Sequence, residues 1–276
     1  MNDQIIATYC ICDEIAKVLK INDDPQCRMT TPEIMTFAIY SASFCFGDYR
    51  RARLFASCNR LFPRLLSHGR LVQRIHAIPE QIWILVFQAM QVLIRNPDNH
   101  LFIVDSFPVK TYENHKSFRA RIFCGKEYHG YSASRKQYFF GIKVHMIVDS
   151  DGIPIEFAFT PGSHSDIRAF RNLSLCLKEG AKILADCAYL DYDFEAKLEL
   201  IEGITLLSRR KRNSKRQRSF DCNHQINLCR NRVETVFSSI TSRMPRHIRA
   251  RTEKGFCLKI MFFIFAYMIQ KFCPLA

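Results

Sequence analysis

Two kinds of hydrophobic pattern divide the chain. Up to about residue 95, apolar positions recur every three or four residues, as in 5–19 and 81–94, which predicts amphipathic helices. The turn-forming sequence NPDN then occupies 96–99, and beyond it apolar residues alternate with polar ones or run continuously, as they do in strands. We therefore predict an all-helical region over residues 1–98 and a second domain over residues 99–276.

The second domain shows strand and helix patterns in a definite order. Strands are predicted for LFIVDSF (101–107), YFFGIKVHMIVD (138–149), IPIEFAFT (153–160), AKILADCAYL (181–190) and GITLLSRR (203–210). Helices are predicted for SDIRAFRNL (165–173), DYDFEAKLELIE (191–202) and NHQINLCRNRVETVFSSITSRM (223–244). The second and third strands flank the turn SDG and should form a hairpin. This order predicts an α/β domain with a mixed sheet flanked by helices.

The longest apolar run is IMFFIFAYMI at 260–269, between Lys259 and Lys271. It is shorter than the ~20 residues that a membrane span requires, so we expect a buried helix and no membrane partner. The N-terminal sequence has no basic segment followed by a long apolar stretch, and the 12 cysteines contain no CxxC pair. Both features favour reduced thiols and a cytoplasmic protein.

The charge balance points to a polyanionic partner. Lys and Arg total 40 against 26 Asp and Glu, a formal net charge of +14, which favours nucleic acid, with an acidic membrane surface as the rival. Seven basic residues lie among the ten of RRKRNSKRQR at 209–218. We expect this run to contact DNA phosphates, although a solvated loop would show the same composition. Its proposed contacts are Arg209, Arg210, Lys211, Arg212, Lys215 and Arg216.

Three acidic residues stand in apolar surroundings. Asp105 and Asp186 each come at the carboxyl end of an apolar strand, where ligand sites of open sheets gather. Glu234 lies at the edge of the apolar stripe of helix 223–244. Singly, each acid has an ordinary explanation: a turn cap, an ion pair with an arginine, or a helix-face partner of Arg230. Together, three hard oxygen ligands predict a Mg²⁺ or Mn²⁺ site, because an unpaired buried carboxylate is costly.

Such a trio is suited to attack on a phosphodiester. Two divalent ions roughly 3.5–4 Å apart can activate a hydroxyl and stabilise the leaving 3′ oxygen. We expect Asp105 to bridge both ions, because its strand should be the most central one.

Several sequence blocks resemble those of the DDE transposases of bacterial insertion sequences, and most closely the insertion-sequence-982 branch. The blocks are VDSFPV, GYSASRKQYFFGIKVHMIVDSDGIPIEF, TPGSHSDIRAF, LADCAYLDYDFE, RRKRNSKR, RNRVETVFSSI and ARTEKGFCLKIMFFIFAYMI. They cover the chain from about residue 101 to residue 270 in the order found in that branch. The resemblance implies a ribonuclease H-like (retroviral-integrase-like) catalytic domain.

The resemblance also assigns roles to individual residues. It implies that Asp105, Asp186 and Glu234 bind the metal ions, and that Arg230 helps to hold the DNA or the site. Related enzymes carry a Y-R-E-K signature around the glutamate, but here Asn227 stands at the tyrosine position and Thr241 at the lysine position. The tyrosine and lysine roles are therefore unassigned.

A G-x-K-x-H block of the same family falls on Gly141, Lys143 and His145. The two polar side chains project from the same side of their strand, because strand side chains alternate. They are candidates for phosphate or acid contacts near the metal ions. Alternatively, they form the polar face of a half-exposed strand.

The function implied by the resemblance is cleavage at the ends of an insertion sequence and joining of the 3′-hydroxyls to target DNA. The partner would be double-stranded DNA, with the helical region 1–98 as a possible DNA-end-binding module. A homodimer is expected when two ends are joined, and the protein would act in the cytoplasm at the nucleoid. The alternatives are a ribonuclease H-like nuclease that joins no strands, and a non-catalytic DNA-binding protein derived from a transposase.

Overall fold

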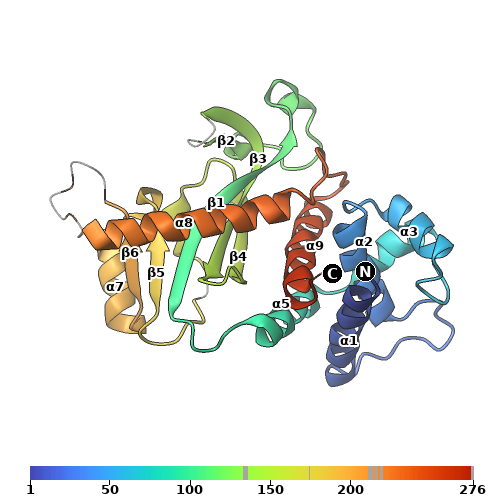
Figure 1. Ribbon diagram of the computed structural model, residues 1–276. Helices are drawn as coiled ribbons and strands as arrows, with labels where there is room; N and C mark the ends of the chain where they lie inside the picture. Colours follow the sequence, from blue (N-terminus) through green and yellow to red (C-terminus); the bar gives the residue numbers. More distant parts are fainter. Residues whose placement is uncertain (133–135, 174, 211–213, 215–216, 218–219, 275–276) are drawn as a thin grey trace. The chain divides into compact units, whose positions relative to one another are not determined.

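The structure is a computed structural model that describes residues 1–132, 136–173, 175–210, 214, 217 and 220–274 (Figure 1). It divides into two compact units, one formed by residues 1–95 together with 239–276 and the other by residues 96–238. The C-terminal segment therefore groups with the N-terminal helices, whereas the sequence pattern assigned it to the second domain. The pattern showed that the segment is buried but not what buries it.

The first unit is built from helices. They are α1 (Asn2–Val18), α2 (Thr31–Phe44), α3 (Tyr49–Cys58), α4 (His68–Ala77), α5 (Glu80–Ile94) and α9 (Glu253–Phe272). α9 is apolar on all sides and packs on α2 and α5. Trp83 lies with its ring 4.7 Å from that of Phe262, and Phe87 stacks on Phe265. These contacts place the apolar run 260–269 in the core of this unit.

α9 is the one helix of the described chain that is long and apolar enough to cross a membrane by itself. Its apolar stretch is 72% buried inside the protein. The bent pair α4 and α5 passes the same test of length and composition only when the two are taken as one span. Burial against α2 and α5 therefore accounts for the composition of α9.

The second unit contains a six-stranded mixed sheet. Its strands are β1 (Leu101–Tyr112), β2 (His129–Ser132), β3 (Gln137–Asp149), β4 (Pro154–Pro161), β5 (Lys182–Ala185) and β6 (Thr205–Ser208). The order is β2-β3-β1-β5-β6, and β4 also pairs with β3. The predicted β3–β4 hairpin is confirmed, and so is the central place of β1. β1 pairs in parallel with β5, as the argument from strand ends requires, whereas the short strand β2 was not predicted.

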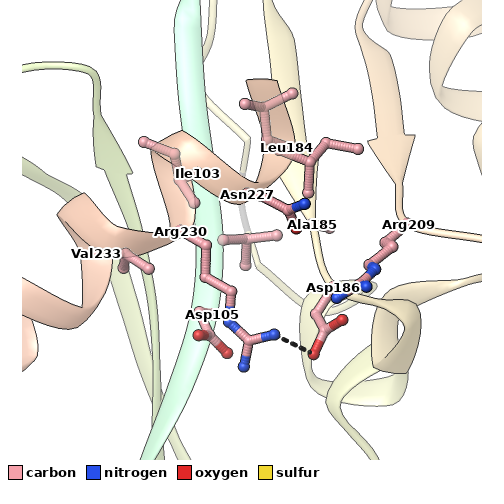
Figure 2. A pocket seen from close by; sticks show the side chains of 11 residues that line it. Ile103, Asp105, Leu184, Ala185, Asp186, Arg209, Asn227, Arg230 and Val233 are labelled. Carbon is pink, nitrogen blue, oxygen red and sulfur yellow. Dashed lines mark hydrogen bonds and ion pairs between the residues drawn. The ribbon is translucent and has the colours of Figure 1, made fainter. Parts of the chain in front are cut away.

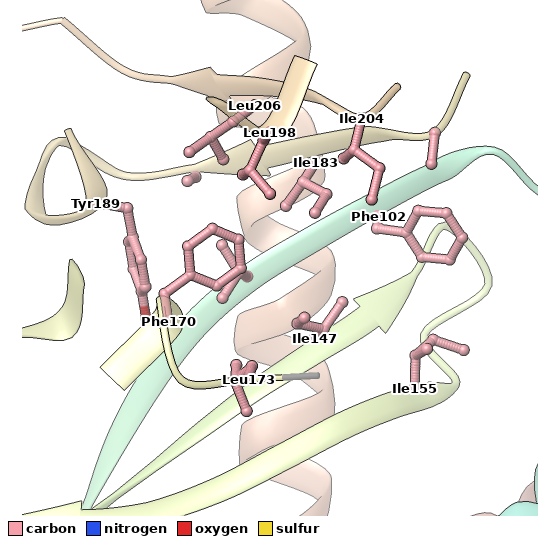
Figure 3. Packing of buried hydrophobic residues seen from close by; sticks show 13 residues of the cluster. Phe102, Ile147, Ile155, Phe170, Leu173, Ile183, Tyr189, Leu198, Ile204 and Leu206 are labelled. Carbon is pink, nitrogen blue, oxygen red and sulfur yellow. The ribbon is translucent and has the colours of Figure 1, made fainter. Parts of the chain in front are cut away.

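Helices cover both faces of this sheet. They are α6 (Asp166–Phe170), α7 (Tyr192–Glu202) and α8 (Phe220–Thr241), and α6 is shorter than predicted. On one face Phe102 and Val104 of β1 pack with residues of α6 and α7, including Phe170, which Figure 3 shows with α8 beyond the strands. On the other face Phe107 packs against Phe237 of α8, with ring centroids 4.6 Å apart. Alternation along β1 thus sends adjacent side chains to different helical layers.

The backbone at Gly141, the glycine of the G-x-K-x-H block, leaves no room for a side chain. Its φ of +157° lies outside the usual range of residues that carry a side chain. A Cβ built there would lie 2.2 Å from the carbonyl oxygen of Val109 in β1. The close approach of β1 and β3 at this point therefore requires glycine.

Candidate active site

Asp105 and Asp186 lie at the same edge of the sheet. In the parallel pair β1–β5, Val104 is opposite Ala185, so the two following residues are the aspartates. Both line one pocket, shown in Figure 2. The Oδ1 atom of each aspartate accepts a hydrogen bond from the next backbone N–H, at 2.8 Å from Ser106 for Asp105 and 2.7 Å for Asp186. These bonds leave each Oδ2 atom available to partners in the pocket.

Arg230 of α8 connects the pocket to the third acid. Its Nη1 atom donates to Oδ2 of Asp186 at 3.1 Å, and its Nε atom donates to Oε1 of Glu234 at 3.2 Å. Figure 2 shows the guanidinium between the carboxylates of Asp105 and Asp186. Glu234 itself is exposed and does not line the pocket. The three acids predicted from the sequence therefore surround one arginine, which the pattern had placed one helical turn before the glutamate.

The electrostatics of the pocket follow from burial and from this arrangement. Burial raises the pKa of Asp105 to about 6, opposed by the N–H of Ser106 and by Arg230, while Asp186 acts in the same direction as burial. Burial alone would lower the pKa of Arg230, but Asp186, Asp105 and Glu234 together raise it above its usual value. Arg230 thus favours the charged form of Asp105, and the three carboxylates favour the charged form of Arg230.

The donor atoms suit a divalent metal ion, but their spacing differs from that of a complete metal site. Carboxylate oxygens are the ligands that Mg²⁺ and Mn²⁺ prefer. Among the residues that the structure describes, no three His, Cys, Asp or Glu side chains form a group that could hold a metal ion. Arg230 binds Oδ2 of Asp186 and Oε1 of Glu234, an oxygen of each of two acids that the sequence predicted as metal ligands.

Lys143 and His145 lie on the other face of the sheet from Asp105. His145 is opposite Ser106 in the β1–β3 pair, so both point to the side that α6 and α7 cover. Nζ of Lys143 donates to Oδ1 of Asp166 at 3.0 Å and to the carbonyl of His164 at 2.9 Å. The shared side of Lys143 and His145 is confirmed, but the acid that they approach is Asp166, which the sequence had indicated only as a helix start.

His145 is a buried histidine with a lowered pKa. Its side chain is fully buried, its Nε2 contacts Oγ1 of Thr160 at 2.8 Å, and its Nδ1 is 3.9 Å from Oδ1 of Asp166. Burial lowers its pKa from 6.5 to about 4; Asp166 opposes this shift, whereas Lys143 and His164 add to it. The histidine therefore stays neutral in the folded protein at pH values where it is protonated in the unfolded chain.

We expect His145 to destabilise the fold as the pH falls from about 6.5 to about 4, because only the unfolded chain takes up its proton in that range. His145→Gln keeps a polar side chain but removes this titration. The free energy of unfolding, measured in urea at pH 5 and pH 7.5, should fall less with acid in the variant than in the unmodified protein. Equal losses in the two proteins would contradict this account of His145.

The structure describes the side chains of Arg209 and Arg210 in the basic run 209–218, and their surroundings differ. Arg209 is exposed and lines the pocket. Arg210 forms a two-bond ion pair with Glu195 of α7, at 2.8 and 2.6 Å, and its side chain is 7% exposed. Its guanidinium also lies over the ring of Tyr192, 4.7 Å from the ring centroid. The other predicted contacts, Lys211, Arg212, Lys215 and Arg216, lie outside the described residues.

Comparison with known families bears on these residues. Residues 96–269 match the family described as Transposase DDE domain, which is more than half of the chain. The matched segment contains Asp105, Asp186 and Glu234. No curated protein matches the chain.

Proposed function

Because the chain belongs to the family of transposase DDE domains, we propose that it cuts DNA at the ends of its own insertion sequence and joins the freed 3′-hydroxyls to target DNA. The observation that carries this proposal is the convergence of Asp105, Asp186 and Glu234 on Arg230. The order of the mixed sheet is compatible with a ribonuclease H-like fold, and the sequence blocks favour the insertion-sequence-982 branch.

Asp105, Asp186 and Glu234 would hold two Mg²⁺ or Mn²⁺ ions. Bound there, divalent ions would activate the attacking hydroxyl and stabilise the leaving 3′ oxygen. Asp105, on the central strand, is the proposed shared ligand. Arg230 would neutralise Asp186 and Glu234 in the absence of DNA and offer its planar guanidinium to a backbone phosphate when DNA is bound.

The partners follow from the reaction and from the charge. We propose double-stranded DNA as the partner, bound by the basic run next to the pocket and by the helical N-terminal region, where Arg50, Arg51 and Arg60 are exposed. A homodimer would bring two element ends together. The protein would act in the cytoplasm at the nucleoid, without a membrane partner.

The direct test is to incubate the protein with Mg²⁺, a target plasmid and a DNA fragment that contains its gene and both flanks. We expect cuts at two defined positions that bracket the gene, followed by joined products. Cutting at scattered positions without joining would favour the nuclease alternative. Binding without any cutting would favour a non-catalytic DNA-binding protein.

A second test concerns the basic run. Replacing Arg209 and Arg212 with Gln is expected to reduce the slope of log affinity for DNA against log salt by up to about 2, because each phosphate contact contributes roughly 0.9. Fluorescence anisotropy between 50 and 200 mM salt would measure the slope. The matched control neutralises two exposed lysines elsewhere in the same unit, Lys182→Gln with Lys197→Gln. An equal effect of both pairs would assign the run to a solvated loop.

A further inference from the structure

A second polar cluster lies behind the strand that carries Asp105. Oγ of Ser106 donates to Oδ1 of Asp166 at 3.2 Å, and the same oxygen accepts from Lys143 at 3.0 Å. The side chains of Asp166 and Lys143 are 18% and 15% exposed, so the pair is largely removed from water. Such a pair is costly to bury unless hydrogen bonds complete it, and Ser106 supplies one of them.

Ser106 connects this cluster to the candidate active site. Its side chain points to the Asp166 face, whereas its backbone N–H donates to Oδ1 of Asp105, which points to the α8 face. Holding the serine hydroxyl restricts rotation of the strand at this residue, and with it the direction of the N–H that orients the Asp105 carboxylate. Ser106 therefore bonds to one aspartate on each face of the sheet.

The same short helix reaches the second aspartate. Asp166 is the first residue of α6, and Phe170 is its last. The ring of Phe170 stands perpendicular to that of Tyr189, with centroids 5.8 Å apart. Figure 3 shows these two side chains next to each other. Tyr189 is fully buried and ends the turn Cys187–Tyr189, whose first N–H binds Asp186. α6 thus contacts Ser106, whose N–H binds Asp105, and Tyr189, which lies in the turn whose first N–H binds Asp186.

We propose that Asp166 is a positioning residue, which through Ser106 fixes the carboxylate of Asp105 relative to that of Asp186. The proposal rests on the proposed function, since it assumes that the two aspartates act together on metal ions and DNA. A purely structural ion pair would stabilise the fold without acting on Asp105 in particular. If Asp166 positions Asp105, removing the Ser106 hydroxyl should weaken metal binding. If the Asp166–Lys143 pair only stabilises the fold, removing that hydroxyl should leave metal binding unchanged.

The test compares two hydroxyls of the same cluster. Ser106→Ala removes the hydroxyl that links Asp166 to Asp105, and Ser106→Thr keeps a hydroxyl at that position. Thr160→Val is the matched control, because the Thr160 hydroxyl contacts His145 in the cluster but has no described bond to Asp105 or Ser106. For each full-length protein we would measure Mn²⁺ affinity by calorimetry without DNA, the cleavage rate with DNA, and the unfolding midpoint.

We expect Ser106→Ala to weaken Mn²⁺ binding about tenfold and to slow cleavage about tenfold, the lower end of the loss seen when a hydrogen-bond partner of a metal ligand is removed. Ser106→Thr should restore most of both, and Thr160→Val should stay within about twofold of the unmodified protein. Equal losses for Ser106→Ala and Thr160→Val, tracking the unfolding midpoint, would overturn the positioning role. Normal Mn²⁺ binding and cleavage in Ser106→Ala would do the same.

The role of Asp166 is tested by combining its replacement with Ser106→Ala and comparing cleavage rates. If it acts through Ser106, Asp166→Asn should slow cleavage much less in the Ser106→Ala background than in the unmodified protein. Full additivity of the two changes would contradict the proposed path. Failure of the proposed function looks different: the unmodified protein would then neither bind Mn²⁺ nor cut DNA, which would remove the premise and the positioning role with it.

Discussion

Asp105→Asn, Asp186→Asn and Glu234→Gln are each expected to lower the rate of DNA cleavage by roughly 10³-fold or more, since a correctly held metal ion supplies several kcal/mol of transition-state stabilisation. Each change preserves the size of the side chain and removes one negative oxygen ligand. DNA affinity should stay within about twofold, because phosphate contacts come from basic side chains. Single-turnover cleavage and fluorescence anisotropy measure the two effects separately.

Asp151→Asn is the matched control for these three variants. Asp151 is an exposed acid of the same unit, in the turn between β3 and β4, and does not line the pocket. Its replacement should leave cleavage unchanged. Any of the three variants that cut DNA at the unmodified rate would lose its assignment as a metal ligand.

Arg210→Met is expected to lower the free energy of unfolding by about 3 kcal/mol, because it removes a cation that pairs with the nearly buried carboxylate of Glu195. The side chain of Glu195 is 12% exposed, and its Oε1 atom also accepts a hydrogen bond from the hydroxyl of Ser208, at 2.6 Å. Replacing Glu195 with Leu in the same chain should recover most of the loss, since both charges of the Arg210–Glu195 pair are then removed. Urea unfolding of the single and double variants measures this recovery.

Arg209→Met is the control for that series, because Arg209 is the exposed neighbour. Its effect on stability should stay within about 0.5 kcal/mol. If Arg209→Met and Arg210→Met destabilised the protein equally, the buried ion pair would not be the cause. The comparison also separates two residues that the sequence presents as one basic run.

The sequence predicted the placement of the two aspartates because local rules decide it. An apolar strand that ends on an acid brings the acid to an edge of the sheet, and the parallel pairing of β1 with β5 makes that edge common to Asp105 and Asp186. Glu234 and Arg230 are four residues apart on one helix, so their contact also follows from local geometry.

The sequence did not predict which residues distant along the chain contact one another. Arg210 looks like its basic neighbours, and only the fold shows that Glu195 of α7 meets it. Asp166 looks like an ordinary first-turn acid, although its carboxylate contacts Ser106, which is 60 residues earlier in the chain. For α9, an all-round apolar helix shows burial but not its partners, which are the N-terminal helices. In each case the missing information is which distant element approaches.

The most direct test of the central claim is a crystal structure of the full-length protein with element-end DNA and Mn²⁺, with the manganese located by anomalous scattering. The account predicts manganese bound by carboxylate oxygens of Asp105, Asp186 and Glu234, with Arg230 moved from Asp186 or Glu234 toward a DNA phosphate. Manganese found only at other residues, with Arg230 still bound to both acids beside correctly placed DNA, would contradict it.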